Sequence, residues 1–258
     1  MNSTSLRVAA AQFSSTDDPG ANLSVIRDAA RAAAEAGARL VVCPEASHAN
    51  FSTPLAAVAE PLDGRFADGV RSLAAELGVL LVVGMFTPAS DGRVRNTLLA
   101  TGAGTEASYD KIHLYDAFGS RESDTVEAGH DVVTFAALGT TIGLATCYDL
   151  RFADQFTALG RAGAELVCVP ASWGEGPGKA EQWDLLVRAR ALDAQAWLVA
   201  CDQAWTPPAG ADPLGIGRSA VVDPLGGVRG RLAAASGVLV SDVDLALVPD
   251  VRARVPIL

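Results

Sequence analysis

Residues 36–47 read Ala-Gly-Ala-Arg-Leu-Val-Val-Cys-Pro-Glu-Ala-Ser, and residues 162–172 read Ala-Gly-Ala-Glu-Leu-Val-Cys-Val-Pro-Ala-Ser. In both stretches a glycine ends a helical pattern, and a short apolar run typical of a buried strand follows. A proline then ends the strand, because proline has no backbone N–H to donate to a neighbouring strand. The two copies lie almost half the chain apart and predict a two-fold internal pseudo-repeat. They differ after the proline, where Glu45 in the first copy corresponds to Ala171 in the second. Ligands of α/β folds bind beyond the carboxyl ends of strands, so Glu45 is a candidate functional residue.

Strands and helices alternate on either side of these two stretches. Apolar runs predict strands, and the spacing of apolar residues predicts helices ending at glycines such as Gly37 and Gly78. The predicted strands cover residues 6–12, 40–43, 79–83, 142–146, 166–169, 197–200, 219–222 and 228–232, and the predicted helices cover 23–33, 66–77, 152–161 and 183–190. This alternation indicates an α/β layered fold.

The composition narrows the class of protein. The chain has 258 residues, 50% of them apolar, which suits a single domain over residues 1–258. A net charge of −10 argues against a nucleic-acid binder, which needs clustered Lys and Arg. Residues 1–5 are short and polar and no long apolar run follows, so we expect no signal peptide, no membrane span and a cytoplasmic location. Four widely spaced cysteines and three histidines predict neither a disulfide framework nor a metal site.

Cys147 follows an apolar run, in the segment Leu-Ala-Thr-Cys-Tyr-Asp-Leu-Arg-Phe over residues 144–152. A thiol at such a strand-to-helix turn can project into a cleft, where backbone amides favour the thiolate and can stabilise an oxyanion. A buried structural cysteine fits the same position equally well, because free cysteine behaves as a small hydrophobic residue. Cys43, Cys168 and Cys201 lie in or at the ends of apolar strands and are expected to be structural.

Lys111 lies in an apolar and aromatic segment, Tyr-Asp-Lys-Ile-His-Leu-Tyr over residues 109–115. Its charge resists burial without a partner, so it is either a fixed cation near a developing oxyanion or an edge-strand residue facing solvent. Glu45 is either a general base or a carboxylate in the first turn of a helix. A cysteine hydrolase needs a base, and His113 is expected to support the site rather than titrate in it. A desolvated glutamate beside a lysine can take that role.

Taken together, the three segments resemble the nitrilase, or carbon–nitrogen hydrolase, superfamily, which is known by a Glu–Lys–Cys triad in this chain order. Glu45 matches the glutamate that follows an apolar strand and a proline. Lys111 matches the lysine of Tyr-x-Lys-x-His-Leu, and Cys147 matches the nucleophile of Cys-Tyr-Asp-x-Arg-Phe. Residues 170–173 and 188–191 also look like family segments, so the resemblance extends over nearly the whole chain.

The resemblance implies an αββα sandwich that pairs through its helices into a homodimer or larger homo-oligomer with a four-layer centre. It implies a small-molecule amide substrate and no cofactor. In the implied mechanism, Glu45 accepts the proton of Cys147, and the resulting thiolate forms a thioester that water hydrolyses. Lys111 and the backbone N–H of Tyr148 would stabilise the oxyanion. A second carboxylate, Glu122, would orient Lys111 or the substrate.

Within the superfamily, the motif segments look most like those of omega-amidases and deaminated glutathione amidases, which act on small amides bearing a carboxylate. Arg151 could pair with such a carboxylate, or it could form a structural bridge with Asp149. The family-like segment after the second apolar strand places Ala171 and Trp173 among the expected substrate-binding residues.

Two other functions remain open from the residues. The same site fits a hydrolase of N-carbamoyl amino acids, in which Arg151 would have the same role. A catalytically inactive binding subunit of the same fold is a third interpretation, although the intact triad speaks against it. The loops over residues 173–179 and 205–217, rich in Gly and Pro, are expected to shape the pocket.

Overall fold

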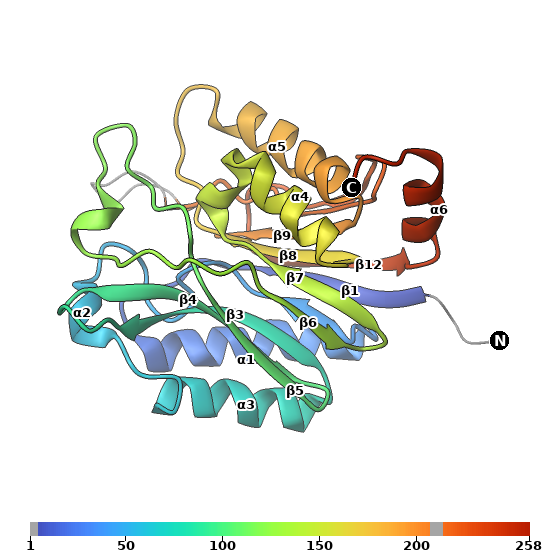
Figure 1. Ribbon diagram of the computed structural model, residues 1–258. Helices are drawn as coiled ribbons and strands as arrows, with labels where there is room; N and C mark the ends of the chain where they lie inside the picture. Colours follow the sequence, from blue (N-terminus) through green and yellow to red (C-terminus); the bar gives the residue numbers. More distant parts are fainter. Residues whose placement is uncertain (1–4, 207–213) are drawn as a thin grey trace.

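Two six-stranded sheets face each other between two layers of helices in the computed structural model, which describes residues 5–206 and 214–258 (Figure 1). The first sheet has the strand order β12 (Gly237–Asp244), β1 (Ser5–Gln12), β2 (Leu40–Val42), β3 (Leu80–Pro88), β4 (Val94–Gly102), β5 (Thr105–Asp110). The second has the order β11 (Val228–Arg231), β10 (Ala220–Val222), β9 (Trp197–Asp202), β8 (Leu166–Ala171), β7 (Thr140–Leu144), β6 (Thr134–Ala137). The αββα sandwich implied by the family resemblance is confirmed.

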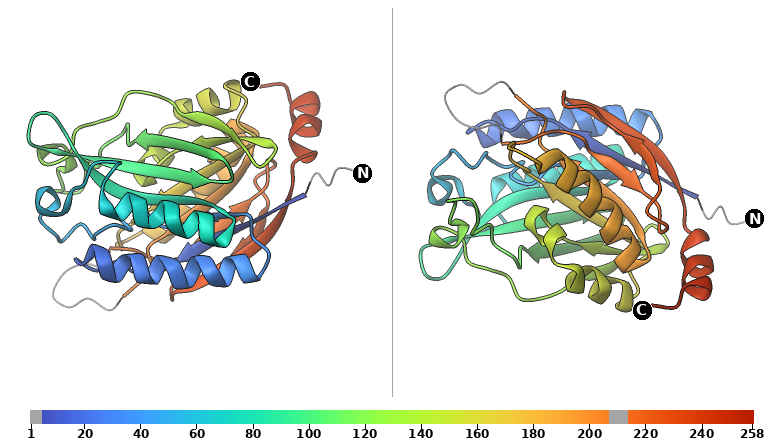
Figure 2. Two further views of the ribbon diagram at one scale, coloured as in Figure 1. Left: turned by 90° about the horizontal axis from the view of Figure 1, so that it is seen from below. Right: turned by 90° about the horizontal axis from the view of Figure 1, so that it is seen from above.

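The helices cover the outer faces of the two sheets in pairs. Helices α1 (Pro19–Glu35) and α3 (Arg65–Leu77) lie on the first sheet, and α4 (Ala153–Arg161) and α5 (Lys179–Ala194) lie on the second. Figure 2 shows the first pair side by side from below and the second pair from above. The shorter elements α2 (Leu55–Val58), η1 (Glu122–Asp124), η2 (Cys147–Arg151) and α6 (Leu247–Arg254) lie outside these pairs. No helix in the two described ranges is long and apolar enough to traverse a bilayer.

The internal repeat predicted from the sequence corresponds to two similar halves of the sandwich. Strands β1, β2 and β3 are parallel neighbours in the first sheet, as are β7, β8 and β9 in the second. An antiparallel hairpin follows each set, β4–β5 in one and β10–β11 in the other. The repeated stretches form β2 and β8, and their glycines Gly37 and Gly163 have φ of 86° and 91°, the left-handed conformation that ends a helix.

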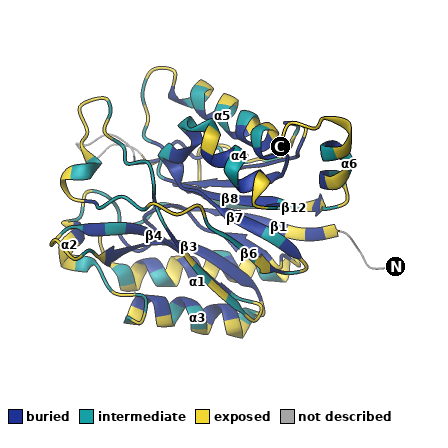
Figure 3. Ribbon diagram, in the orientation of Figure 1, coloured by how far each residue is buried: buried dark blue, intermediate teal, exposed yellow. Residues whose placement is uncertain are grey.

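The apolar runs of the central strands are continuous because both of their faces are buried. In β1, Val8 and Ala10 pack into the core between the two sheets, whereas Ala9 and Ala11 pack against the residues of α1 and α3. Each fully buried Val or Leu side chain contributes roughly 1.5–3 kcal/mol to stability. Figure 3 shows the buried strands between helices whose outer faces are exposed.

The sequence patterns did not predict six elements. Strands β5, β6 and β12 lie at sheet edges, where strands bury only part of their surface and show weak periodicity, and helices α2 and α6 are short. Strand β4 is an inner, mostly buried strand, but its polar residues Arg95, Asn96 and Thr97 interrupt the apolar pattern. Strand β12 returns from the second half of the chain and pairs antiparallel with β1 in the first sheet. The predicted strand over 142–146 ends earlier, at Leu144, and the predicted helix over 183–190 extends over Lys179–Ala194.

Candidate active site

Glu45, Lys111 and Cys147 line one cavity of about 400 Å³ although they are far apart in the sequence. Glu45 lies three residues beyond β2, Lys111 directly follows β5, and Cys147 is the first residue of η2 after β7. Their exposed fractions are 1%, 2% and 7%. The alternatives of a solvent-facing lysine and of a glutamate in the first turn of a helix are therefore wrong, because Lys111 is buried and no helix begins at Glu45.

The backbone presents Cys147 in a conformation that non-glycine residues rarely adopt. Its φ is 45°, and strain of this kind is retained mainly at functional sites. The turn is fixed by a capping box in which the carboxylate of Asp149 accepts a hydrogen bond of 2.7 Å from the backbone N–H of Thr146. The thiol is thereby held at the surface of the cavity.

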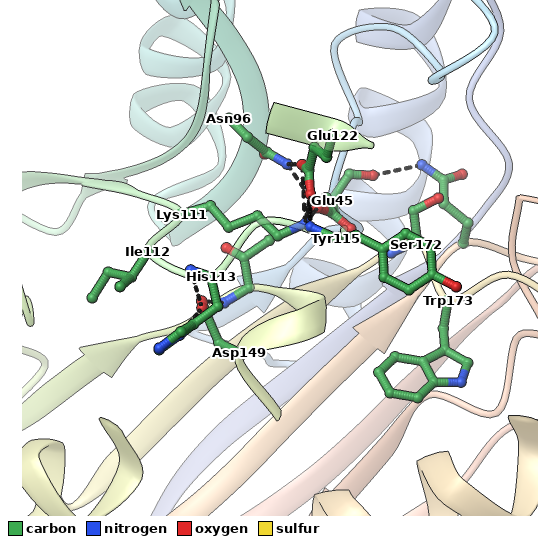
Figure 4. A network of polar contacts seen from close by, with 12 residues as sticks. Glu45, Asn96, Lys111, Ile112, His113, Tyr115, Glu122, Asp149, Ser172 and Trp173 are labelled. Atoms are coloured by element: carbon green, nitrogen blue, oxygen red, sulfur yellow. Dashed lines mark hydrogen bonds and ion pairs between the residues drawn. The ribbon is translucent and has the colours of Figure 1, made fainter. Parts of the chain in front are cut away.

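Asp149 also joins the cysteine turn to the segment that carries Lys111. Its fully buried carboxylate accepts hydrogen bonds from the Tyr109 hydroxyl at 2.6 Å and from the backbone N–H of His113 at 3.0 Å. The Nδ1 atom of His113 lies 2.9 Å from the same carboxylate (Figure 4). His113 thus supports the site, as expected, and Asp149 fixes Cys147 relative to Lys111.

Lys111 lies between two carboxylates, those of Glu45 and Glu122. Its Nζ atom is 2.9 Å from Glu45 Oε1 and 2.9 Å from Glu122 Oε2. The side-chain amide of Asn96 donates to Glu45 Oε1 at 2.7 Å and to Glu122 Oε1 at 3.2 Å (Figure 4). The backbone N–H of Tyr115 donates to Glu122 Oε2 at 2.6 Å. The structure therefore places Glu122 where it orients Lys111.

Glu45 is held by two further groups that the sequence analysis missed. The backbone N–H of Ser172 donates to its Oε2 at 2.8 Å, and the Gln203 side chain donates to its backbone carbonyl at 2.7 Å. Asn96 was missed as well. Asn96 could have been chosen as a candidate site residue because it is polar and lies next to an apolar stretch. The contact from the backbone N–H of Ser172 has no corresponding signal in the sequence.

Gly84 of β3 allows the backbone of Glu45 to approach the sheet closely. A Cβ atom on Gly84 would lie 2.9 Å from Glu45 Cα and 2.8 Å from Ala46 N. Gly84→Ala is expected to shift Glu45 and lower kcat by roughly 10–100-fold, because small misplacements of a reacting group are costly. Steady-state ammonia release measures the effect. Gly237→Ala is the control, since its added methyl would meet only Leu232 at 3.7 Å; equal kcat in the two folded variants would contradict this role of Gly84.

Burial and the neighbouring charges shift the pKa values of the ionisable groups in the cavity. Burial raises the pKa of Glu45. The positive charge of Lys111 lowers this pKa, and the negative charge of Glu122 raises it. The pKa of Glu45 therefore lies above the ordinary carboxyl value. Burial alone would lower the pKa of Lys111, but Glu122 and Glu45 raise it well above its ordinary value. Lys111 is therefore a permanent ammonium, and Glu45 is a carboxylate with increased affinity for a proton.

The surroundings of Cys147 favour its thiol form. Burial and the negative charge of Glu45 raise its pKa well above the ordinary value, and the smaller effects of Lys111 and the backbone N–H of Ser172 do not reverse this. The backbone N–H of Ser172 favours the thiolate, but burial has the larger effect on the pKa. A proton acceptor must therefore take the thiol proton as the sulfur attacks.

Aromatic and basic side chains contribute to the wall of the cavity. Tyr148, Arg151 and Trp173 line it, whereas Ala171 is fully buried in β8 and does not. The Arg151–Asp149 bridge considered from the sequence is not formed, because Asp149 is engaged by Tyr109, Thr146 and His113. Arg151 instead donates to the Gln182 side chain at 2.7 Å and lies 5.0 Å from the centre of the Trp173 ring.

The two loops expected to shape the pocket contribute to its wall. Trp173, Gly174 and Lys179 come from the first loop and the start of α5, and Leu214 comes from the second loop. Residues 207–213 of the second loop lie outside the described residues.

A buried thiol beside a buried carboxylate and an ammonium, at the strand ends of an αββα sandwich, is an arrangement suited to a cysteine hydrolase. The chain belongs to the carbon–nitrogen hydrolase family, whose pattern matches residues 7–253. A hydrolase from Mycobacterium tuberculosis is 48% identical, over 98% of this chain and 94% of that protein. A deaminated glutathione amidase from Escherichia coli O157:H7 is 34% identical, over 97% of this chain and 95% of that protein.

Solved amidase structures share the fold. One is a variant of the amidase from Nesterenkonia sp. AN1, with the acetamide moiety of fluoroacetamide added covalently at its active-site cysteine. It matches with a TM-score of 0.80 and 26% identity, over 97% of this chain and 95% of that chain. The protein is therefore an enzyme that hydrolyses carbon–nitrogen bonds other than peptide bonds, and its relatives include amidases.

Proposed function

We propose that the protein hydrolyses a small amide bearing a carboxylate, releases ammonia, and forms a thioester on Cys147. The observation that carries the proposal is the convergence of Cys147, Glu45 and Lys111 in one cavity, with ion-pair distances of 2.9 Å around the ammonium. The covalent adduct at the cysteine of the Nesterenkonia amidase variant supports a sulfur nucleophile.

The first half of the reaction follows from the protonation states. Glu45 accepts the thiol proton while the sulfur of Cys147 attacks the amide carbon. The ammonium of Lys111 and the backbone N–H of Tyr148, near the start of η2, stabilise the oxyanion, and each such donor is worth about 3–4 kcal/mol. Glu45 then gives its proton to the nitrogen, the carbon–nitrogen bond breaks, and ammonia leaves behind a thioester.

The second half of the reaction uses the same groups. Glu45 accepts a proton from a water molecule, which attacks the thioester carbonyl while Lys111 again stabilises the oxyanion. The carbon–sulfur bond breaks, the thiolate of Cys147 recovers the proton from Glu45, and the carboxylic acid product leaves. One water is consumed and the enzyme returns to its initial state.

The charge of the cavity supports a substrate with a carboxylate. Lys111 is ion-paired with Glu45 and Glu122, so this cluster offers no free positive charge. Arg151 lines the same cavity, and its contacts in the described residues are an amide and two aromatic rings, without an acidic ion-pair partner. A guanidinium in this state can bind a carboxylate through two hydrogen bonds.

A panel of substrates tests this proposal against the alternatives. We expect faster turnover of carboxylate-bearing amides than of N-carbamoyl amino acids and nitriles. Preferred release of carbon dioxide with ammonia from carbamoyl substrates would identify a carbamoyl hydrolase, for which the position of Arg151 is equally suitable. If the protein turns over none of these substrates, it is a binding subunit. The assembled triad argues against this alternative.

We also propose a homodimer that pairs through α5. Leu185 and Leu192 on the outer side of this helix are 66% and 45% exposed, and Leu225, in the turn whose Gly226 lies against Leu192, is 56% exposed. Exposed apolar patches of this kind mark interfaces. Leu185→Glu is expected to shift the mass measured by light scattering from two chains to one. A single-chain mass in the unsubstituted protein would contradict the proposal.

A further inference from the structure

Lys179 is a further cation of the cavity wall, and the triad does not use it. Its Nζ atom donates a hydrogen bond of 2.9 Å to the Tyr115 hydroxyl. It also lies 4.2 Å from the centre of the Phe118 ring and 5.8 Å from the centre of the Trp173 ring. Lys179 therefore has a defined position in the wall of the cavity, set by aromatic side chains.

The position of Lys179 is unfavourable for a purely structural cation. The residue is only 9% exposed, and it is the first residue of α5, where the helix dipole disfavours positive charge. Among the described residues, no Asp or Glu forms an ion pair with its ammonium, which donates a hydrogen bond to the Tyr115 hydroxyl. Buried charges are ordinarily paired. The missing anion is therefore expected to come from a ligand.

Lys179 and Arg151 both contact the aromatic cluster formed by Tyr115, Tyr148 and Trp173. Arg151 lies 5.0 Å from the centre of the Trp173 ring and 5.7 Å from that of Tyr148, while Lys179 is within 6 Å of Trp173 and of Tyr115. The Tyr115 and Tyr148 rings are themselves in contact, with centres 5.1 Å apart. Both cations thus border the same part of the cavity and bring two unpaired positive charges to it.

We propose that Lys179, together with Arg151, forms the subsite for the remote carboxylate of the substrate and determines the preference for charged over neutral amides. The inference deepens the proposed amidase function and rests on it. Lys179 is a substrate-binding residue in this assignment, and the chemistry at Cys147 does not require it. A loss of Lys179 should therefore affect KM for charged substrates and leave kcat nearly unchanged.

The test compares two amides of equal length, glutaramate with a terminal carboxylate and valeramide without one. In Lys179→Met, KM for glutaramate is expected to rise at least about tenfold, because a charge-assisted hydrogen bond is lost. Its kcat and both parameters for valeramide should stay within about threefold. Lys179→Arg should restore much of the glutaramate affinity. Arg161→Gln, which removes a positive charge from the exposed end of α4, should leave the preference unchanged.

Thermal unfolding separates this role from a structural one. Since Lys179 is a buried cation without an acidic partner, Lys179→Met should unfold at the same or a higher temperature. A lower unfolding temperature, with equal changes for glutaramate and valeramide, would overturn the assignment and make Lys179 structural.

Calorimetric titration with glutarate tests the same contact without turnover. Its Kd should rise at least about tenfold in Lys179→Met, and an unchanged Kd would overturn the inference. If the unsubstituted protein binds glutarate through Lys179 but hydrolyses no amide, the proposed function fails while the anion subsite stands. If valeramide and glutaramate are hydrolysed equally well by both proteins, the subsite fails while the amidase function stands.

Discussion

Cys147→Ala should lower ammonia release by roughly 10⁴-fold or more while the protein stays folded. The sulfur is the atom that forms the thioester, and neither Glu45 nor a water held by Lys111 can replace it in a two-step reaction. The side chain lines the cavity and borders the core of the second sheet, and Cys147→Ala removes only one sulfur atom, so the fold should persist. Steady-state ammonia release gives the rate, and circular dichroism with thermal unfolding reports the fold.

Cys168→Ala is the matched control for this loss. Cys168 is fully buried in β8, in the core between the sheets, and does not line the cavity. This variant should keep its kcat and lose some stability, the reverse of the pattern for Cys147→Ala. If Cys147→Ala releases ammonia at a rate within tenfold of the unsubstituted protein, Cys147 is not the nucleophile.

Glu45→Gln should lower kcat by roughly 10²–10⁴-fold, the usual contribution of a general base. Glutamine is nearly isosteric, and Lys111 keeps its ion pair with Glu122, so the cavity should retain its shape. The loss is large because burial and Glu45 raise the pKa of the Cys147 thiol, which makes attack depend on a proton acceptor. Glu76→Gln is the control, since Glu76 is an exposed partner of Arg31.

The pH profile distinguishes a base from a merely structural carboxylate. Glu45 must be ionised to accept the proton, so activity is present above its pKa and lost as the pH falls through it. Because burial raises that pKa, the acid limb of kcat/KM should lie above the ordinary glutamate value of about 4.3. The residual activity of Glu45→Gln should lack this limb. An acid limb that persists unchanged in the variant would assign the titration to another group.

The fold and the reacting groups could be predicted because they have local signals. The repeated strand-and-proline stretches placed β2 and β8, and the carboxylate after the first of them identified Glu45. Lys111 was conspicuous as a charge within an apolar segment. Each of these signals is contained in about ten consecutive residues, which is the range over which periodicity and chain breakers are informative.

The supporting contacts could not be predicted because they join distant segments. Asn96 reaches Glu45 from β4, the Ser172 N–H reaches it from the end of β8, and Asp149 joins the Lys111 and Cys147 segments. Such contacts depend on how the two sheets face each other, which no single segment encodes.

Mass spectrometry of the enzyme quenched during turnover is the sharpest test of a thioester on Cys147. With a small amide in excess, a fraction of the protein should be heavier by the acyl group, and peptide mapping should place that mass on Cys147. The adduct should be cleaved by hydroxylamine, as a thioester is. Rapid ammonia release with no acylated protein at any quench time, or acylation at a residue other than Cys147, would contradict it.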